Sequence, residues 1–109
     1  MEEGGIGIKY YVLVGTFVEN HPTGDSLQKV MTEHLAYLKI GFDNDSVLLA
    51  GPLTDGIGGM AIVKSEDIQK FCNDDPIVKQ GIQQYRVFEF FANDYLDCLK
   101  QWVADVAGE

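Results

Sequence analysis

Hydrophobic residues follow two different spacings along the chain, and each spacing predicts one kind of secondary structure. Four runs rich in β-branched and aromatic residues predict strands, at residues 8–19, 47–53, 59–64 and 85–91. Stretches with apolar residues three or four positions apart predict helices, at residues 26–41, 68–81 and 93–106. The last helix is expected to carry an apolar stripe of Leu96, Leu99, Trp102, Val103 and Val106.

Polar residues and glycines mark where these helices should begin and end. Asp25 or Ser26 is expected to cap the first helix, which should stop near Gly41. Asp75 before Pro76 restarts the second helical stretch, because Asp is a favoured N-cap and proline is tolerated at the first helical position.

The order of these elements is β-α-β-β-α-β followed by one more helix. This order is typical of an α+β, ferredoxin-like fold, in which four antiparallel strands carry two main helices on one face. The length of 109 residues suits one domain. We therefore expect a single domain over residues 1–109, with a core at residues 8–91 and an added C-terminal helix at residues 93–106.

Both faces of the predicted sheet are apolar. In the first strand one face carries Tyr10, Val12, Val14 and Val18, and the other carries Tyr11, Leu13 and Phe17. The two main helices cover only one face, so the other face needs a partner. The C-terminal helix is one candidate for part of it, and a second copy of the chain, packed sheet against sheet as a homodimer, is favoured.

The charge and composition of the chain exclude several classes of partner. A formal net charge of −9 and a single arginine, Arg86, argue against nucleic acid and anionic membrane surfaces. No segment reaches the length of about 20 apolar residues that spans a bilayer. Residues 1–5 resemble no secretion signal, which predicts a cytosolic location. Cys72 and Cys98 form no CxxC pair and are expected to be buried free thiols.

His34 lies on the apolar stripe of the first predicted helix, with Leu27, Met31 and Leu38. It is either a satisfied core histidine or a general acid and base, because histidine titrates near neutral pH. Asp75 also has two interpretations. It is either only the helix cap before Pro76 or a partner that orients His34.

Other candidate residues have weaker patterns. Gly51 and Pro52 end the second predicted strand, where they form either a simple turn or the wall of a substrate pocket. The glycines of residues 56–59 form no phosphate-binding motif and are expected to serve a turn. The two histidines and the scattered carboxylates have no metal-ligand spacing, so no metal is expected.

Four segments, at residues 33–38, 49–53, 58–63 and 74–82, resemble the YCII-related family in their order and spacing. The resemblance implies a ferredoxin-like dimeric α/β barrel. It also implies an active site built around a histidine and an aspartate, which fall on His34 and Asp75. Family members often have an arginine three residues before the histidine, and this chain has Met31 there.

Two functions are consistent with these patterns. The first is an enzyme that uses His34 and Asp75 for elimination or isomerisation of a small organic molecule, a reaction that needs no cofactor. Aromatic residues are candidates to line its cleft, although core packing explains them equally well: Tyr11, Phe17, Phe88 and Phe90. The alternative is a non-catalytic domain with the same dimeric fold that binds a small molecule or a partner.

Overall fold

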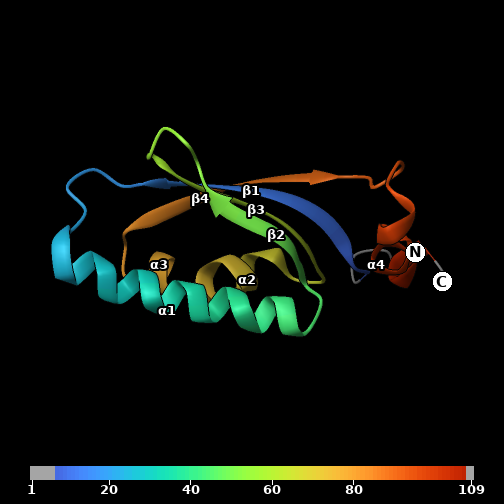
Figure 1. Cartoon of the computed structure of the whole chain (residues 1–109), viewed down its shortest axis with the longest axis horizontal. Helices are drawn as coiled ribbons and strands as arrows, with labels where there is room; N and C mark the ends of the chain where they lie inside the picture. The colour runs from blue at the N-terminus through green and yellow to red at the C-terminus, as the bar shows by residue number, and fades with distance from the viewer. Residues whose placement is uncertain (1–6, 108–109) are drawn as a thin grey trace.

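A four-stranded antiparallel sheet carries three helices on one face (Figure 1). The computed structural model describes residues 7–107. The elements in chain order are β1 (Lys9–Phe17), α1 (Gly24–Asp43), β2 (Val47–Pro52), β3 (Gly58–Ser65), α2 (Ile68–Asp74), α3 (Pro76–Lys79), β4 (Gln83–Phe90) and α4 (Lys100–Ala107). The strand order is β2-β3-β1-β4. The α+β class is confirmed, and the strand order is compatible with a ferredoxin-like fold.

The core lies between the sheet and the helices. β1 is central and pairs with β3 and β4, so that Leu13 lies opposite Ala61 on one side and Val87 on the other. Residues opposite each other share a face of the sheet, and this face packs on Leu38 of α1 and Cys72 of α2. The predicted alternation along the first strand is confirmed for Leu13, which is buried on the helix side.

The predicted bounds of α1 are wrong by two residues at each end. Thr23 is the N-cap, and the helix ends at Asp43, beyond Gly41. Gly41 is not a stop signal, because it lies where the start of β2 crosses the helix. A β-carbon on Gly41 would overlap a methyl group of Val47. The glycine therefore permits close packing of helix and strand.

The start of α3 follows the prediction. The Asp75 side chain accepts a hydrogen bond of 3.1 Å from the backbone N–H of Ile77, and Pro76 occupies the first turn. Gly81 follows the helix with a φ of 73°, a conformation that favours glycine. This turn leads directly into β4, and the Asp75 carboxyl group lies on the helix-covered side of the sheet, where it meets the Tyr85 hydroxyl.

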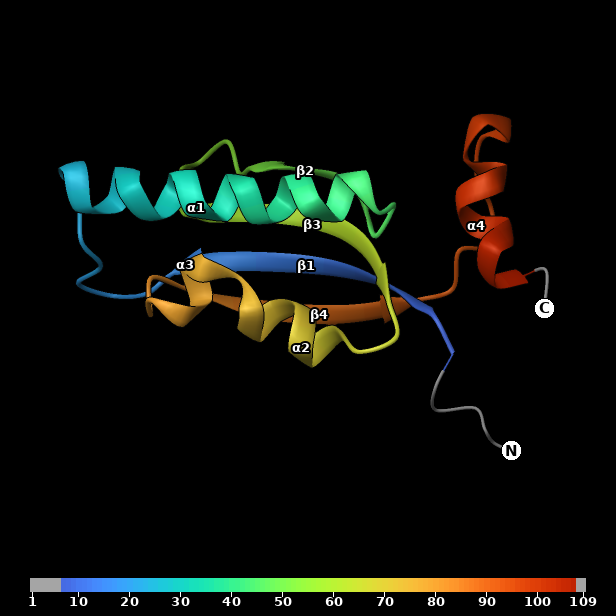
Figure 2. The ribbon, with the colours of Figure 1, turned by 90° about the horizontal axis from the view of Figure 1, so that it is seen from below.

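The C-terminal helix is shorter than predicted and lies beyond one end of the sheet (Figure 2), where it contacts Tyr10 and Lys64 of the other sheet face. It begins at Lys100 after a 3-10 turn over Asp97–Leu99, and residues 93–96 are not helical. Tyr10 donates to the Val103 carbonyl at 2.8 Å, and Lys64 donates to the Trp102 carbonyl at 2.9 Å. The predicted stripe residue Val106 lies outside the side chains described.

The rest of this face stays open. It carries the apolar side chains of Val12, Val14, Leu49, Met60, Ile62 and Phe88, of which Leu49 is 46% exposed and Phe88 is 44% exposed. In the described part of the chain, α4 is the only helix that packs on this face. The sequence predicts that this sheet face needs a partner. In the structure that prediction applies to the middle of the face, because α4 already contacts one end.

The location predicted from the sequence is not tested by the fold. Residues 1–5, on which it rests, lie outside the described residues. Between residues 7 and 107, no helix combines the length and the apolar character needed to cross a membrane. A cytosolic location stays a prediction.

The two cysteines differ, and the prediction that both are buried is wrong for Cys98. Cys72 is buried in the core, whereas Cys98 lies exposed in the 3-10 turn, which faces solvent. Burial, helped by the charge of Asp75, raises the pKa of the Cys72 thiol to about 11.

A disulfide reagent such as DTNB should therefore modify one thiol rapidly in the native protein, because Cys98 is exposed whereas Cys72 is buried with a raised pKa. Cys72 should react only as the chain unfolds in urea. The variant Cys98→Ser should lose the fast phase. A fast phase that persists in Cys98→Ser would contradict the burial of Cys72.

Candidate functional site

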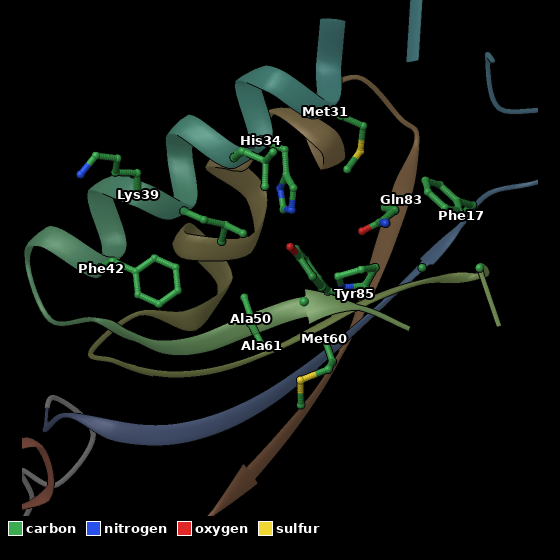
Figure 3. Close-up of a pocket in the computed structure, with 17 residues that line it drawn as sticks. Phe17, Met31, His34, Lys39, Phe42, Ala50, Met60, Ala61, Gln83 and Tyr85 are labelled. Atoms are coloured by element: carbon green, nitrogen blue, oxygen red, sulfur yellow. The ribbon is translucent and has the colours of Figure 1, made fainter. Parts of the chain in front are cut away.

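A pocket of about 700 Å³ lies between α1 and the helix-covered face of the sheet (Figure 3). Most of its wall is apolar. The side chains of α1 and of the sheet contribute Met31, Leu35, Leu38, Phe42, Ala50 and Ala61. Gly51 and Pro52, at the end of β2, also line it. The structure therefore places both residues at the pocket, and their role in substrate binding stays a prediction.

His34 projects from α1 into this pocket (Figure 3) and is 12% exposed. Its Nδ1 atom lies 2.8 Å from Oδ1 and 2.9 Å from Oδ2 of Asp75. Because a carboxylate only accepts hydrogen bonds, Nδ1 is the nitrogen that carries the hydrogen. The free lone pair of a neutral imidazole is then on Nε2, the ring nitrogen not bound to Asp75.

Asp75 is 1% exposed and accepts hydrogen bonds from three donors. Besides His34, the backbone N–H of Ile77 donates to Oδ1 at 3.1 Å and the Tyr85 hydroxyl donates to Oδ2 at 2.8 Å. The same carboxyl group is thus both the N-cap of α3 and the partner of His34. The sequence left open whether Asp75 is a helix cap or the partner of His34, and in the structure its side chain makes both contacts.

Tyr85 is a site residue that sequence reasoning missed. Its position in β4 predicts only a side chain on the apolar, helix-covered face of the sheet. Burial, with the negative charge of Asp75, raises the pKa of the Tyr85 hydroxyl, so the group stays protonated and donates to the carboxylate. The sequence shows a hydroxyl group on an otherwise apolar strand face, but the pattern of β4 does not predict that this hydroxyl donates a hydrogen bond to Asp75.

Gln83, at the start of β4, was also missed. It is 6% exposed and lines the pocket, with its side chain directed into the same space as His34 and Tyr85 (Figure 3). A buried glutamine at a strand end was the available signal, but neither strand propensity nor hydrophobic alternation predicts that such a residue is buried.

The aromatic lining expected from the sequence is mostly wrong. Phe17 lines the pocket, whereas Tyr11 is buried in the core beside it. Phe88 and Phe90 lie on the opposite face, because β4 pairs them with Val12 and Tyr10 of β1. Alternation along β4 therefore carries these two rings away from the site.

The charged groups around the pocket are few. Lys39 is the cationic lining residue of the described pocket, and its ammonium group lies 3.2 Å from Asp43, one helical turn along α1. Figure 3 shows this ammonium group pointing away from the pocket. Residues 7–107 contain no cluster of three or more His, Cys, Asp or Glu side chains suited to a metal ion. His21 stacks on Phe17 outside the pocket lining.

Comparison with known proteins places the chain in a family. No curated protein sequence matches the chain significantly. Residues 10–91, about three quarters of the chain, match the YCII-related domain. This stretch runs from β1 through the end of β4 and contains His34, Asp75 and the whole pocket lining, and α4 lies beyond it. The chain therefore belongs to the YCII-related family.

Proposed function

We propose that this protein is a cofactor-independent lyase or isomerase in which His34 moves a proton on a small organic molecule. The observation that carries the proposal is the contact between the His34 Nδ1 atom and the buried Asp75 carboxylate, beside a pocket of about 700 Å³. A buried acceptor on one ring nitrogen fixes the tautomer and the ring orientation, which are the properties a general base needs.

In the proposed reaction, Nε2 of His34 takes a proton from a carbon next to an electron-withdrawing group. The Asp75 carboxylate stabilises the imidazolium that forms, and the electron pair of the broken C–H bond moves into the substrate. In an isomerisation the imidazolium returns the proton to another carbon, and in an elimination a leaving group departs with its bonding pair. The apolar walls exclude water, which strengthens the charge interaction between His34 and Asp75.

Tyr85 has a positioning role in this proposal. Its hydroxyl holds the second oxygen of Asp75, so that the carboxylate cannot rotate away from His34. Because His34 comes from α1, Asp75 from the N-cap of α3 and Tyr85 from β4, the geometry depends on the packing of three separate parts of the fold. Such support from surrounding structure is typical of preorganised sites.

The proposal includes a homodimer. The open part of the sheet face, with Phe88 and Leu49 at its surface, would pack against the same face of a second copy to form a dimeric α/β barrel. We expect sedimentation equilibrium to give twice the chain mass, and Phe88→Glu to give the mass of one chain while the fold is kept. A monomeric wild type at micromolar concentration would remove this part of the proposal.

The test of the function is a screen of small cyclic and aromatic carbonyl and halogenated compounds. Wild-type protein, without added metal or cofactor, is incubated with each compound, and loss or rearrangement of the compound is followed by NMR. We expect at least one compound to be converted faster than in buffer. Compounds that bind the pocket without any conversion would instead support a non-catalytic binding domain.

A further inference from the structure

Gln83 is a buried polar side chain whose hydrogen-bonding groups have no partner among the described residues. It is 6% exposed, and within residues 7–107 its carboxamide makes no side-chain hydrogen bond. The carboxamide offers two donor hydrogens and one acceptor oxygen. Because no fully buried side-chain nitrogen or oxygen in the described residues lacks a partner, the carboxamide keeps some solvent access, and this access opens on the pocket.

The sheet keeps a space for this side chain. Gly15 of β1 lies opposite Tyr85, two positions from the partner of Gln83, and a β-carbon on Gly15 would overlap the Gln83 Oε1 atom. The same added atom would come within 3.1 Å of the Tyr85 ring. The missing side chain at Gly15 therefore gives the Gln83 amide its place beside Tyr85 and His34, as Figure 3 shows.

The other polar groups of this wall are already occupied. Nδ1 of His34 and the hydroxyl of Tyr85 both bind Asp75, so the carboxamide is the uncommitted neutral group beside the proposed base. An anionic ligand would find no suitable cation at the described lining. Lys39 is paired with Asp43 and points outward, and Met31 adds only apolar surface.

We propose that the Gln83 amide binds the carbonyl oxygen of an uncharged cyclic or aromatic substrate, and so selects carbonyl compounds over hydrocarbons and carboxylates. The inference rests on the proposed function, which takes this pocket as the site that binds the substrate. A carbonyl group makes the neighbouring C–H bond acidic, and negative charge develops on its oxygen when that proton leaves. An N–H donor placed at this oxygen stabilises the charge where it forms.

The test measures binding and needs no turnover. Indanone, indane and indane carboxylate share one ring system and differ only in the polar group, and each is titrated into the full chain while backbone amide signals of the pocket are followed by NMR. Wild type should bind indanone about tenfold more tightly than indane, the effect of one hydrogen bond to a buried amide. Indane carboxylate should bind more weakly than indanone.

The variant Gln83→Met keeps the length of the side chain and removes its hydrogen-bonding groups. It should bind indanone and indane with equal affinity, within about twofold. Gln83→Glu, which keeps the shape but repels a carbonyl oxygen, should also lose the preference, so the result does not depend on one variant. Gln84→Met, an exposed neighbour in β4, is the matched control and should keep the wild-type preference.

Two results would overturn the inference: equal affinity of wild type for indanone and indane, or an unchanged preference in folded Gln83→Met and Gln83→Glu proteins. His34→Gln separates this inference from the proposed function, because it should abolish turnover and keep the preference for indanone. Failure of the function alone would appear as normal selectivity in a wild type that converts no compound.

Discussion

Replacing His34 with glutamine should lower kcat by about a thousandfold, within the range of about 10² to 10⁴ for loss of a general acid or base. Glutamine is close in size and keeps a hydrogen-bond donor for Asp75, so the packing of α1 on α3 is preserved. It cannot take a proton from carbon. KM should change by less than about threefold, because a group that acts mainly on the transition state contributes little to substrate binding.

The other histidine provides the matched control for this experiment. His21→Gln makes the same chemical change in a residue that stacks on Phe17 and does not line the described pocket. Its kcat should stay within about twofold of wild type. Equal losses in the two variants, or no loss in His34→Gln, would show that His34 does not carry the proton transfer.

Replacing Asp75 with alanine should lower the free energy of unfolding by about 3 kcal/mol. The substitution removes the cap of α3 and leaves the Ile77 N–H and the Tyr85 hydroxyl without their acceptor. It also removes the partner of His34 in a buried position. Urea unfolding followed by circular dichroism measures this loss, with the slope of the transition checked for two-state behaviour.

Two further variants divide the structural part of this effect from the functional part. Asp74→Ala removes the neighbouring carboxylate, which pairs with Lys70 at the surface, and should cost less than about 1 kcal/mol. Asp75→Asn keeps a good helix cap and should cost about 1 kcal/mol. Its amide no longer offers two acceptor oxygens, so turnover should still fall at least about a hundredfold. An Asp75→Ala protein as stable as wild type would contradict the contacts assigned to Asp75.

The parts of the fold that depend on local chemistry were predictable from the sequence. Alternation along β1 places Leu13 in the core, and the pair Asp75 and Pro76 starts α3. Element ends set by tertiary packing were not predictable. The position of Gly41 predicts a helix end, but in the structure the glycine leaves space for the Val47 side chain to pack against α1. The segment before α4 has helical spacing but forms a 3-10 turn, and the contacts with the sheet come from Trp102 and Val103 further along the chain.

Of the candidate site, the sequence predicted the residues His34 and Asp75 but not the contact between them. His34 and Asp75 are 41 positions apart, and no local pattern shows that two such residues meet. The resemblance to the YCII-related family named the pair, and the packing of α1 against α3 brings them together. Tyr85 was missed because the alternation along β4 already explains its burial. Gln83 was missed because neither alternation nor strand propensity predicts that it is buried. Their roles become visible only when the tertiary structure brings the start of β4 to the pocket that α1 lines.

The most direct test of the central claim is whether His34 moves a proton to and from carbon in this pocket. Indanone carries exchangeable hydrogens next to its carbonyl group, and their replacement by deuterium from D₂O is followed by NMR. Wild type should exchange them faster than buffer at the same pH, whereas His34→Gln should bind indanone and exchange it no faster than buffer. Exchange at the same rate in both proteins, or no acceleration by wild type that binds indanone, would contradict the role proposed for His34.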